Sequence, residues 1–292
     1  MKRLGRLTLA VLILVAIAYA AFQIIEREPE QQGQGSSAQV KVPAKPPASA
    51  KQRLAIAQAM FTERCKKSGF FIHKTVTDVE GIFLMKIRPK ETNSGNQFRL
   101  DDPYGNDTGT EGYIKNFLRG RDEVGSLNTK RPVTNGYYYV EAIDPADGRR
   151  YRYTGGMKDV EKISSIIGGG DGRTKFMVRE YTLDKVPAPG QRPRYGVTYD
   201  DISTREEREY WIAGSSLKVI DLETDEVIAE RIGYMMDYGQ GSRAGHRSPW
   251  LLAAKNACPS FPTTSAKRPV QIHQTRRFVE KVLHIKQGKT DG

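Results

Sequence analysis

The sequence has few of the residues that most often carry metal-binding or nucleophilic chemistry, with two cysteines and four histidines in 292 residues. The histidines show no H-x-x-x-H or H-E-x-x-H spacing, which argues against a zinc site. The phosphate-loop pattern G-x-x-x-x-G-K-[ST] and the G-x-S-x-G nucleophile elbow are also missing. We therefore expect no metal, no cofactor and no catalytic residues that a motif would identify.

Two segments come closest to a chemical motif. Ser242 lies among glycines with His246 four residues later, but Gln240 occupies the first glycine position of the elbow. Residues 100–112 hold acidic and amide side chains of the kind that bind calcium, but Tyr104 stands where a ligand belongs. We interpret the first segment as an ordinary loop and the second as an acidic surface loop.

A long apolar run is present at residues 7–25, between a basic and an acidic cluster. At ~1.5 Å per helical residue it reaches about 28 Å, close to the hydrocarbon thickness of a bilayer. The positive flank should remain in the cytoplasm. We therefore predict a single-pass anchor at residues 1–26 in a bacterial inner membrane, with the following chain in the periplasm. A cleaved signal remains an alternative, because residues 18–20 form a small-x-small cleavage site.

Residues 27–50 are dominated by Gln, Gly, Ser, Ala and Pro, which is typical of a flexible linker. Residues 51–292 then form one predicted periplasmic domain.

Cys65 and Cys258 stand near the two ends of that domain. In an oxidising compartment an even pair of cysteines favours a disulfide, with two buried thiols as the alternative.

The hydrophobic periodicity of this domain predicts an α+β fold, in which one mainly antiparallel sheet is flanked by N- and C-terminal helices. Three consecutive strands with two short turns, at 214–216 and 223–225, indicate an antiparallel meander. The expected helices are 51–65, 111–118, 157–167 and 274–285. The expected strands are 70–76, 81–88, 136–143, 149–154, 175–183, 195–202, 209–213, 217–222 and 227–234.

The net charge of +12 is concentrated at the C-terminal end. Residues 1–50 carry +3, residues 51–237 carry +1, and residues 238–292 carry +8. In the predicted C-terminal helix, one face holds Phe278, Val282 and Ile285, and we expect this face to dock on the domain. Arg276, Arg277 and Lys281 are expected on the exposed side, as a surface that binds an acidic partner, anionic lipid headgroups or an anionic wall polymer. A solvated basic surface that aids solubility is the alternative.

Tyrosines on the strands provide a second candidate surface, and we select Tyr137 and Tyr139 because some rings must face outward.

Taken together, the sequence predicts a non-enzymatic, membrane-tethered envelope protein that binds a protein or an anionic wall polymer. A component of a secretion or pilus machine and a toxin-immunity protein both fit this description. A periplasmic hydrolase of an envelope polymer is the alternative. Nucleic acid is a poor candidate partner for an exported domain, and the sequence does not predict an oligomeric state.

Overall fold

A computed structural model of the chain describes residues 49–90, 97–98, 101–105, 109–119, 136–165, 169–264 and 269–287. All of them belong to one compact unit, Val42–Gly292. Within these residues no helix is both long and apolar enough to cross a membrane. The predicted anchor at residues 1–26 lies outside the described residues, as does the predicted linker up to residue 48.

Among the described residues, nine strands form one sheet with the order β1-β9-β8-β7-β3-β4-β5-β6, and β10 pairs with β9 beside β1. Neighbouring strands are antiparallel except that β3 runs parallel to both β4 and β7. The predicted α+β class with a mainly antiparallel sheet is therefore confirmed. The strands are β1 (Gly69–Ile72), β2 (Val76–Val79), β3 (Gly81–Leu84), β4 (Tyr139–Ile143), β5 (Arg150–Ile163), β6 (Lys175–Pro187), β7 (Tyr195–Asp201), β8 (Ile212–Asp221), β9 (Glu226–Met236), β10 (Ala257–Cys258) and β11 (Leu283–Ile285).

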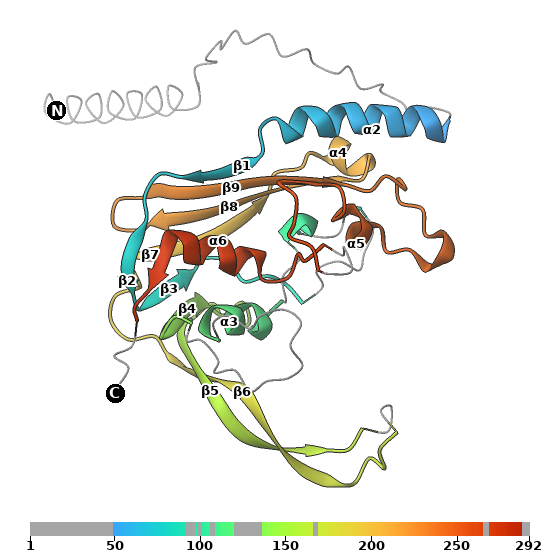
Figure 1. Ribbon diagram of the computed structural model, residues 1–292. Helices are drawn as coiled ribbons and strands as arrows, with labels where there is room; N and C mark the ends of the chain where they lie inside the picture. The colour runs from blue at the N-terminus through green and yellow to red at the C-terminus, as the bar shows by residue number, and fades with distance from the viewer. Residues whose placement is uncertain are drawn as a thin grey trace, which may run out of the picture. The chain divides into compact units, whose positions relative to one another are not determined.

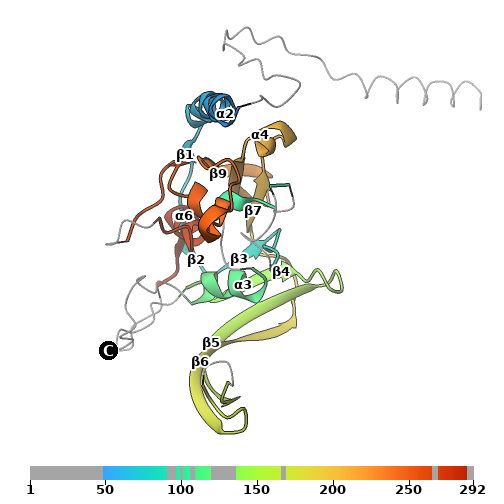
Figure 2. The same ribbon diagram turned by 90° about the vertical axis from the view of Figure 1, so that its right-hand side faces the viewer.

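Helices cover both faces of this sheet (Figures 1 and 2). α2 lies on one face of the β1-β9-β8 region, and α6 lies on the opposite face. α3 packs against β4 and β5, and the β5–β6 hairpin extends away from the other strands. The helical elements are α2 (Ala50–Cys65), η1 (Pro103–Gly105), α3 (Glu111–Leu118), α4 (Arg205–Glu209), η2 (Ala244–His246), α5 (Pro249–Ala253) and α6 (Gln274–Val282).

The N-terminal helix forms as the sequence predicts and is held to the sheet covalently. Ser49 caps α2 by accepting a hydrogen bond from the backbone N–H of Gln52 at 3.2 Å. A disulfide then joins Cys65, the last residue of α2, to Cys258 of β10, with 5.5 Å between the Cα atoms. The predicted disulfide is confirmed, and it closes a loop of 193 residues.

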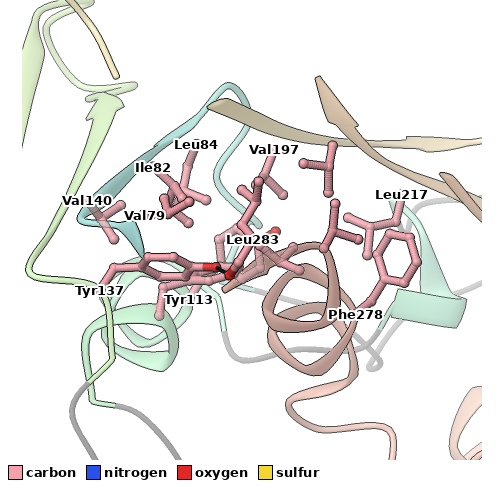
Figure 3. Packing of buried hydrophobic residues seen from close by; sticks show 14 of the residues in the cluster. Val79, Ile82, Leu84, Tyr113, Tyr137, Val140, Val197, Leu217, Phe278 and Leu283 are labelled. Carbon is pink, nitrogen blue, oxygen red and sulfur yellow. Dashed lines mark hydrogen bonds between the residues drawn. The ribbon is translucent and has the colours of Figure 1, made fainter. Parts of the chain in front are cut away.

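The C-terminal helix docks through the apolar face that its spacing predicts. Phe278 and Val282 are buried in the main core, where Figure 3 shows Phe278 pointing toward Leu217 of β8. The helix is shorter than expected, because α6 ends at Val282 and the next residues form β11, which pairs in parallel with β2. Ile285 therefore packs against the core from a strand and not from the helix.

The predicted helix at residues 157–167 is wrong over its described part, because residues up to Ile163 continue strand β5. β5 pairs with β6 without interruption from Tyr151 opposite Pro187 to Ile163 opposite Lys175. The backbone N–H and C=O groups of β5 that face β6 find hydrogen-bond partners across the hairpin. Strand pairing therefore overrides the helical spacing of Val160 and Ile163.

The predicted turn at residues 214–216 is also wrong, because β8 passes through it as one strand. A side chain on Gly214 would collide with the Tyr234 ring at 2.5 Å, so this glycine provides space in the sheet and does not mark a turn. The two serines bond to Asp102 and Glu230. The strand expected at 209–213 begins only at Ile212, because residues before it form α4 with a Thr204–Glu207 capping box.

Smaller differences concern strand ends. The expected strand at 70–76 divides into β1 and β2, and the strand expected at 81–88 ends at Leu84. The strand expected at 136–143 starts three residues later, at Tyr139. The expected helix at 111–118 forms over the same residues, and the turn at 223–225 is present between β8 and β9.

Candidate functional site

A pocket of about 440 Å³ opens beside α6, on the sheet face that this helix covers. Its walls come from parts of the chain that are distant in sequence: β1, η1, β9, the segment after β10 and α6. The lining residues are Phe70, Tyr104, Arg231, Pro259, Ser260, Phe261, Pro262, Gln274, Arg276, Arg277, Phe278, Glu280 and Lys281.

The pocket combines positive charge with aromatic surface. Among the described residues, four basic side chains line it against one carboxylate, that of Glu280. All three basic residues selected from the sequence are among them. Phe70, 52% exposed, contributes an aromatic wall, and the Lys281 Nζ lies 5.5 Å from the centroid of its ring. Such a site attracts an anionic group and gives an apolar neighbour of that group a surface to contact.

Arg276 does not have the exposed position that the sequence predicts. Its side chain is only 3% exposed, and its Nε lies 3.4 Å from the Glu280 carboxylate one helical turn later. The Arg276 guanidinium is buried because the face of α6 that packs on the domain extends beyond Phe278 and Val282. Lys281 is exposed and Arg277 is partly exposed, so these two residues carry the accessible charge of α6.

Arg231 is the basic residue of the pocket that sequence reasoning missed. It stands in β9, opposite Phe70 of β1 and Leu217 of β8, so its side chain is on the face that α6 covers. It is 2% exposed, and its guanidinium carbon lies 5.1 Å from the centroid of the Tyr104 ring. The sequence did contain a signal for this residue, because Arg231 is a charged residue among the apolar residues on the same face of the strand, Ala229, Gly233 and Met235.

Tyr104 lines the pocket next to Arg231. Burial raises the pKa of its hydroxyl, and the Arg231 charge acts in the opposite direction. The protonated hydroxyl donates a hydrogen bond to the Pro259 carbonyl at 3.2 Å. A Cβ atom on Gly233 would meet the Tyr104 ring at 2.2 Å, so a glycine in β9 is required for the ring to lie this close to the sheet.

The two tyrosines selected from the sequence lie elsewhere in the fold. Tyr137 is 2% exposed, and its hydroxyl donates to the Leu283 carbonyl at 2.7 Å within the core (Figure 3). It is therefore a core residue, and the expectation that its ring faces a partner is wrong. Tyr139 is partly buried beneath the Arg152 guanidinium, 4.0 Å from its ring centroid. The structure does not bring it to the pocket.

The segments that came closest to a chemical motif do not form a catalytic or metal-binding cluster in the described residues. Ser242 and His246 are both exposed, and no hydrogen bond is found between their side chains there. The acidic residues of 100–112 that are described pair with cations, as Asp101 does with Lys86 at 2.9 Å. In that part of the chain no three metal-ligating side chains are grouped, and residues 106–108 lie outside it.

Comparisons with protein-family models, with curated proteins and with solved structures found no match to this chain.

Proposed function

We propose that this chain is a non-enzymatic protein of the bacterial cell envelope that binds a protein or wall-polymer partner through the pocket beside α6. In this proposal residues 1–26 tether it to the inner membrane, and residues 51–292 stand in the periplasm. A component of a secretion or pilus machine, or an immunity protein against an envelope toxin, would have this organisation.

One observation carries the proposal: four basic side chains surround a pocket that also has aromatic and proline walls. Within the described residues neither Arg277 nor Lys281 forms an ion pair, so their charges face the solvent and the pocket. A cationic, partly apolar concave surface is a suitable binding site for an acidic partner.

The disulfide supports the proposed compartment. A bond between Cys65 and Cys258 persists where the surroundings are oxidising, as in the bacterial periplasm, and is rare in the cytosol. It joins the helix that directly follows the proposed linker to the sheet. A pull on the tether would therefore reach the sheet through a covalent bond.

The location is tested with the full chain carrying a C-terminal reporter that is active only outside the cytoplasm. We expect an active reporter and a protein that alkaline carbonate does not extract from membranes. An inactive reporter contradicts the export, and a shortened, extractable product beginning near Tyr19 or Ala21 contradicts the tether.

The binding surface is tested in cells with a photo-crosslinking amino acid at position 281. We expect an adduct with an envelope protein or wall polymer. The control places the same amino acid at position 51, an exposed lysine of α2 on the opposite face of the sheet. Equal adducts from both positions, or none from position 281, would contradict binding through this pocket.

A further inference from the structure

Arg231 differs from every other buried arginine in the described part of the chain. Four arginines are buried there, and three of them pair with a carboxylate. These pairs are Arg88–Asp102, Arg208–Asp201 and Arg276–Glu280. For Arg231 the described residues supply no carboxylate, and its Nε and Nη2 have no hydrogen-bond partner.

A buried charge without a counter-charge is costly, because the surroundings replace neither its hydration nor its hydrogen bonds. The Tyr104 ring attracts the guanidinium through its face but offers no acceptor to the N–H groups in that contact. The unfilled hydrogen-bonding capacity of Arg231 is at the wall of a pocket of about 440 Å³. An anionic group that enters the pocket would supply both the charge and the acceptors.

We propose that this pocket binds a carboxylate of an acidic peptide segment, which pairs with the Arg231 guanidinium while Arg277 and Lys281 attract it from the rim. This proposal rests on the proposed function and specifies the partner chemistry of the same site. Carboxylate and guanidinium match in geometry, since two parallel N–H groups of arginine reach two oxygens.

The pocket walls favour a peptide over a wall polymer. Phe70, Phe261 and Phe278 offer aromatic surface for an apolar residue next to the acidic one. β1 lies at the end of the sheet, and in the described residues β9 is its single paired strand (Figure 1). Its outer backbone edge can therefore receive an extended peptide as an added strand.

The register brings such a peptide to Arg231. A strand added beside β1 would lie about 10 Å from β9, twice the usual spacing of strands. Phe70 and Arg231 are paired residues, so the peptide residue opposite Phe70 points to the same face. A glutamate at that position and Arg231 can meet over the Phe70 ring, because both side chains are long.

The test uses the purified full chain in detergent micelles and two end-capped hexapeptides. One contains a single glutamate among valines and threonines, and the other has glutamine in its place. Affinity is measured by thermophoresis at low and at physiological salt. We expect the glutamate peptide to bind about tenfold or more tightly than the glutamine peptide, as loss of a buried charge pair would give.

Arg231→Met should abolish the difference between the two peptides without lowering the melting temperature, because it removes an uncompensated charge and keeps the volume. Arg179→Met is the matched control, since Arg179 is exposed on β6 and does not line the pocket. This control should leave the preference for glutamate unchanged. Should Arg231→Met fail to fold, the Arg231 Nε–Hε signal in arginine-labelled wild-type protein provides the same test, since only the glutamate peptide should shift it.

Equal affinity of the two peptides for the wild type, or an undiminished preference in Arg231→Met, would overturn the proposal. It would also be overturned if inorganic phosphate or phosphatidylglycerol vesicles displaced the dye-labelled glutamate peptide at a lower concentration than unlabelled peptide does. None of these three outcomes bears on the reporter and photo-crosslinking results, so failure of this proposal is distinguishable from failure of the proposed function.

Discussion

Two buried arginines near η1, one beside Gly105 and one over the Tyr104 ring, differ in whether a carboxylate accompanies them. Arg88 is 1% exposed, pairs with Asp102 at 2.9 Å and lies with its guanidinium carbon 3.9 Å from the centroid of the Tyr199 ring. Arg231 is buried to the same degree, but among the described residues its guanidinium lies beside an aromatic ring and a pocket and has no carboxylate partner. Two arginines that are equally buried can thus have different roles, and we distinguish the roles by whether a described carboxylate pairs with the guanidinium.

Removing the charge pair between Arg88 and Asp102 should have the largest effect on stability. Asp102→Asn leaves the shape of the side chain but removes the charge that faces Arg88, and it weakens the acceptor of the Ser215 hydroxyl. We expect the free energy of unfolding to fall by about 3–5 kcal/mol, measured by urea denaturation. Asp101→Asn is the control, because its partly exposed pair with Lys86 should contribute about 1 kcal/mol or less. Equal losses in both variants would contradict the comparison.

The next largest effect should come from the helix that borders both the core and the pocket. Phe278 is buried against the main core cluster and also lines the pocket. We expect Phe278→Ala to lower the free energy of unfolding by about 3–4 kcal/mol and to weaken peptide binding. Phe71→Ala, which truncates a ring on β1 that is 42% exposed, should cost about 0.5 kcal/mol or less. A loss below that of Phe71→Ala would show that α6 is not docked through this ring.

Arg231→Met tests the unpaired region directly. Because the wild-type guanidinium has no carboxylate partner in the described residues, we expect the free energy of unfolding to stay unchanged or to rise by about 1 kcal/mol. Urea denaturation beside Asp102→Asn gives the contrast in one experiment. A loss above about 2 kcal/mol would show that Arg231, like Arg88, is retained for stability.

The smallest effect on stability should come from the rim. Arg277→Glu together with Lys281→Glu reverses two charges that form no ion pair in the described residues. We expect a change in melting behaviour equivalent to about 0.5 kcal/mol or less. Binding of the glutamate peptide should weaken most at low salt, because screening reaches about 8 Å at physiological ionic strength. Unchanged binding at low salt would leave Arg231 as the sole anion contact.

Much of the fold follows from local sequence, and the errors have a common cause. The helix ending at Cys65 has its spacing and its cap within its own segment, and the helix at 111–118 and the strand near 195–202 follow the apolar spacing of their own residues. The missed elements depend on distant partners. Residues 157–163 are a strand because β6 pairs with them, and Gly214 belongs inside β8 because the Tyr234 ring needs the space. Neither partner is visible in the local pattern.

The candidate site was anticipated in part. The charge gradient led to Arg276, Arg277 and Lys281, and all three line the pocket. Helical spacing places Arg276 and Glu280 one turn apart, but it could not show that Arg276 is buried, because the width of a buried helix face depends on what covers it. Nor could it connect these residues with Arg231, whose approach depends on β9 and α6 lying face to face.

The sequence by itself determined the α+β class, the pairing of its two cysteines and the positive C-terminal segment. These features require only periodicity, residue counts and the absence of competing partners. Only the tertiary structure decided which charges are satisfied. Asp102 pairs with Arg88 at a buried position, whereas in the described part of the chain Arg231 faces an aromatic ring and a pocket, because counter-charges come from residues that folding alone brings together.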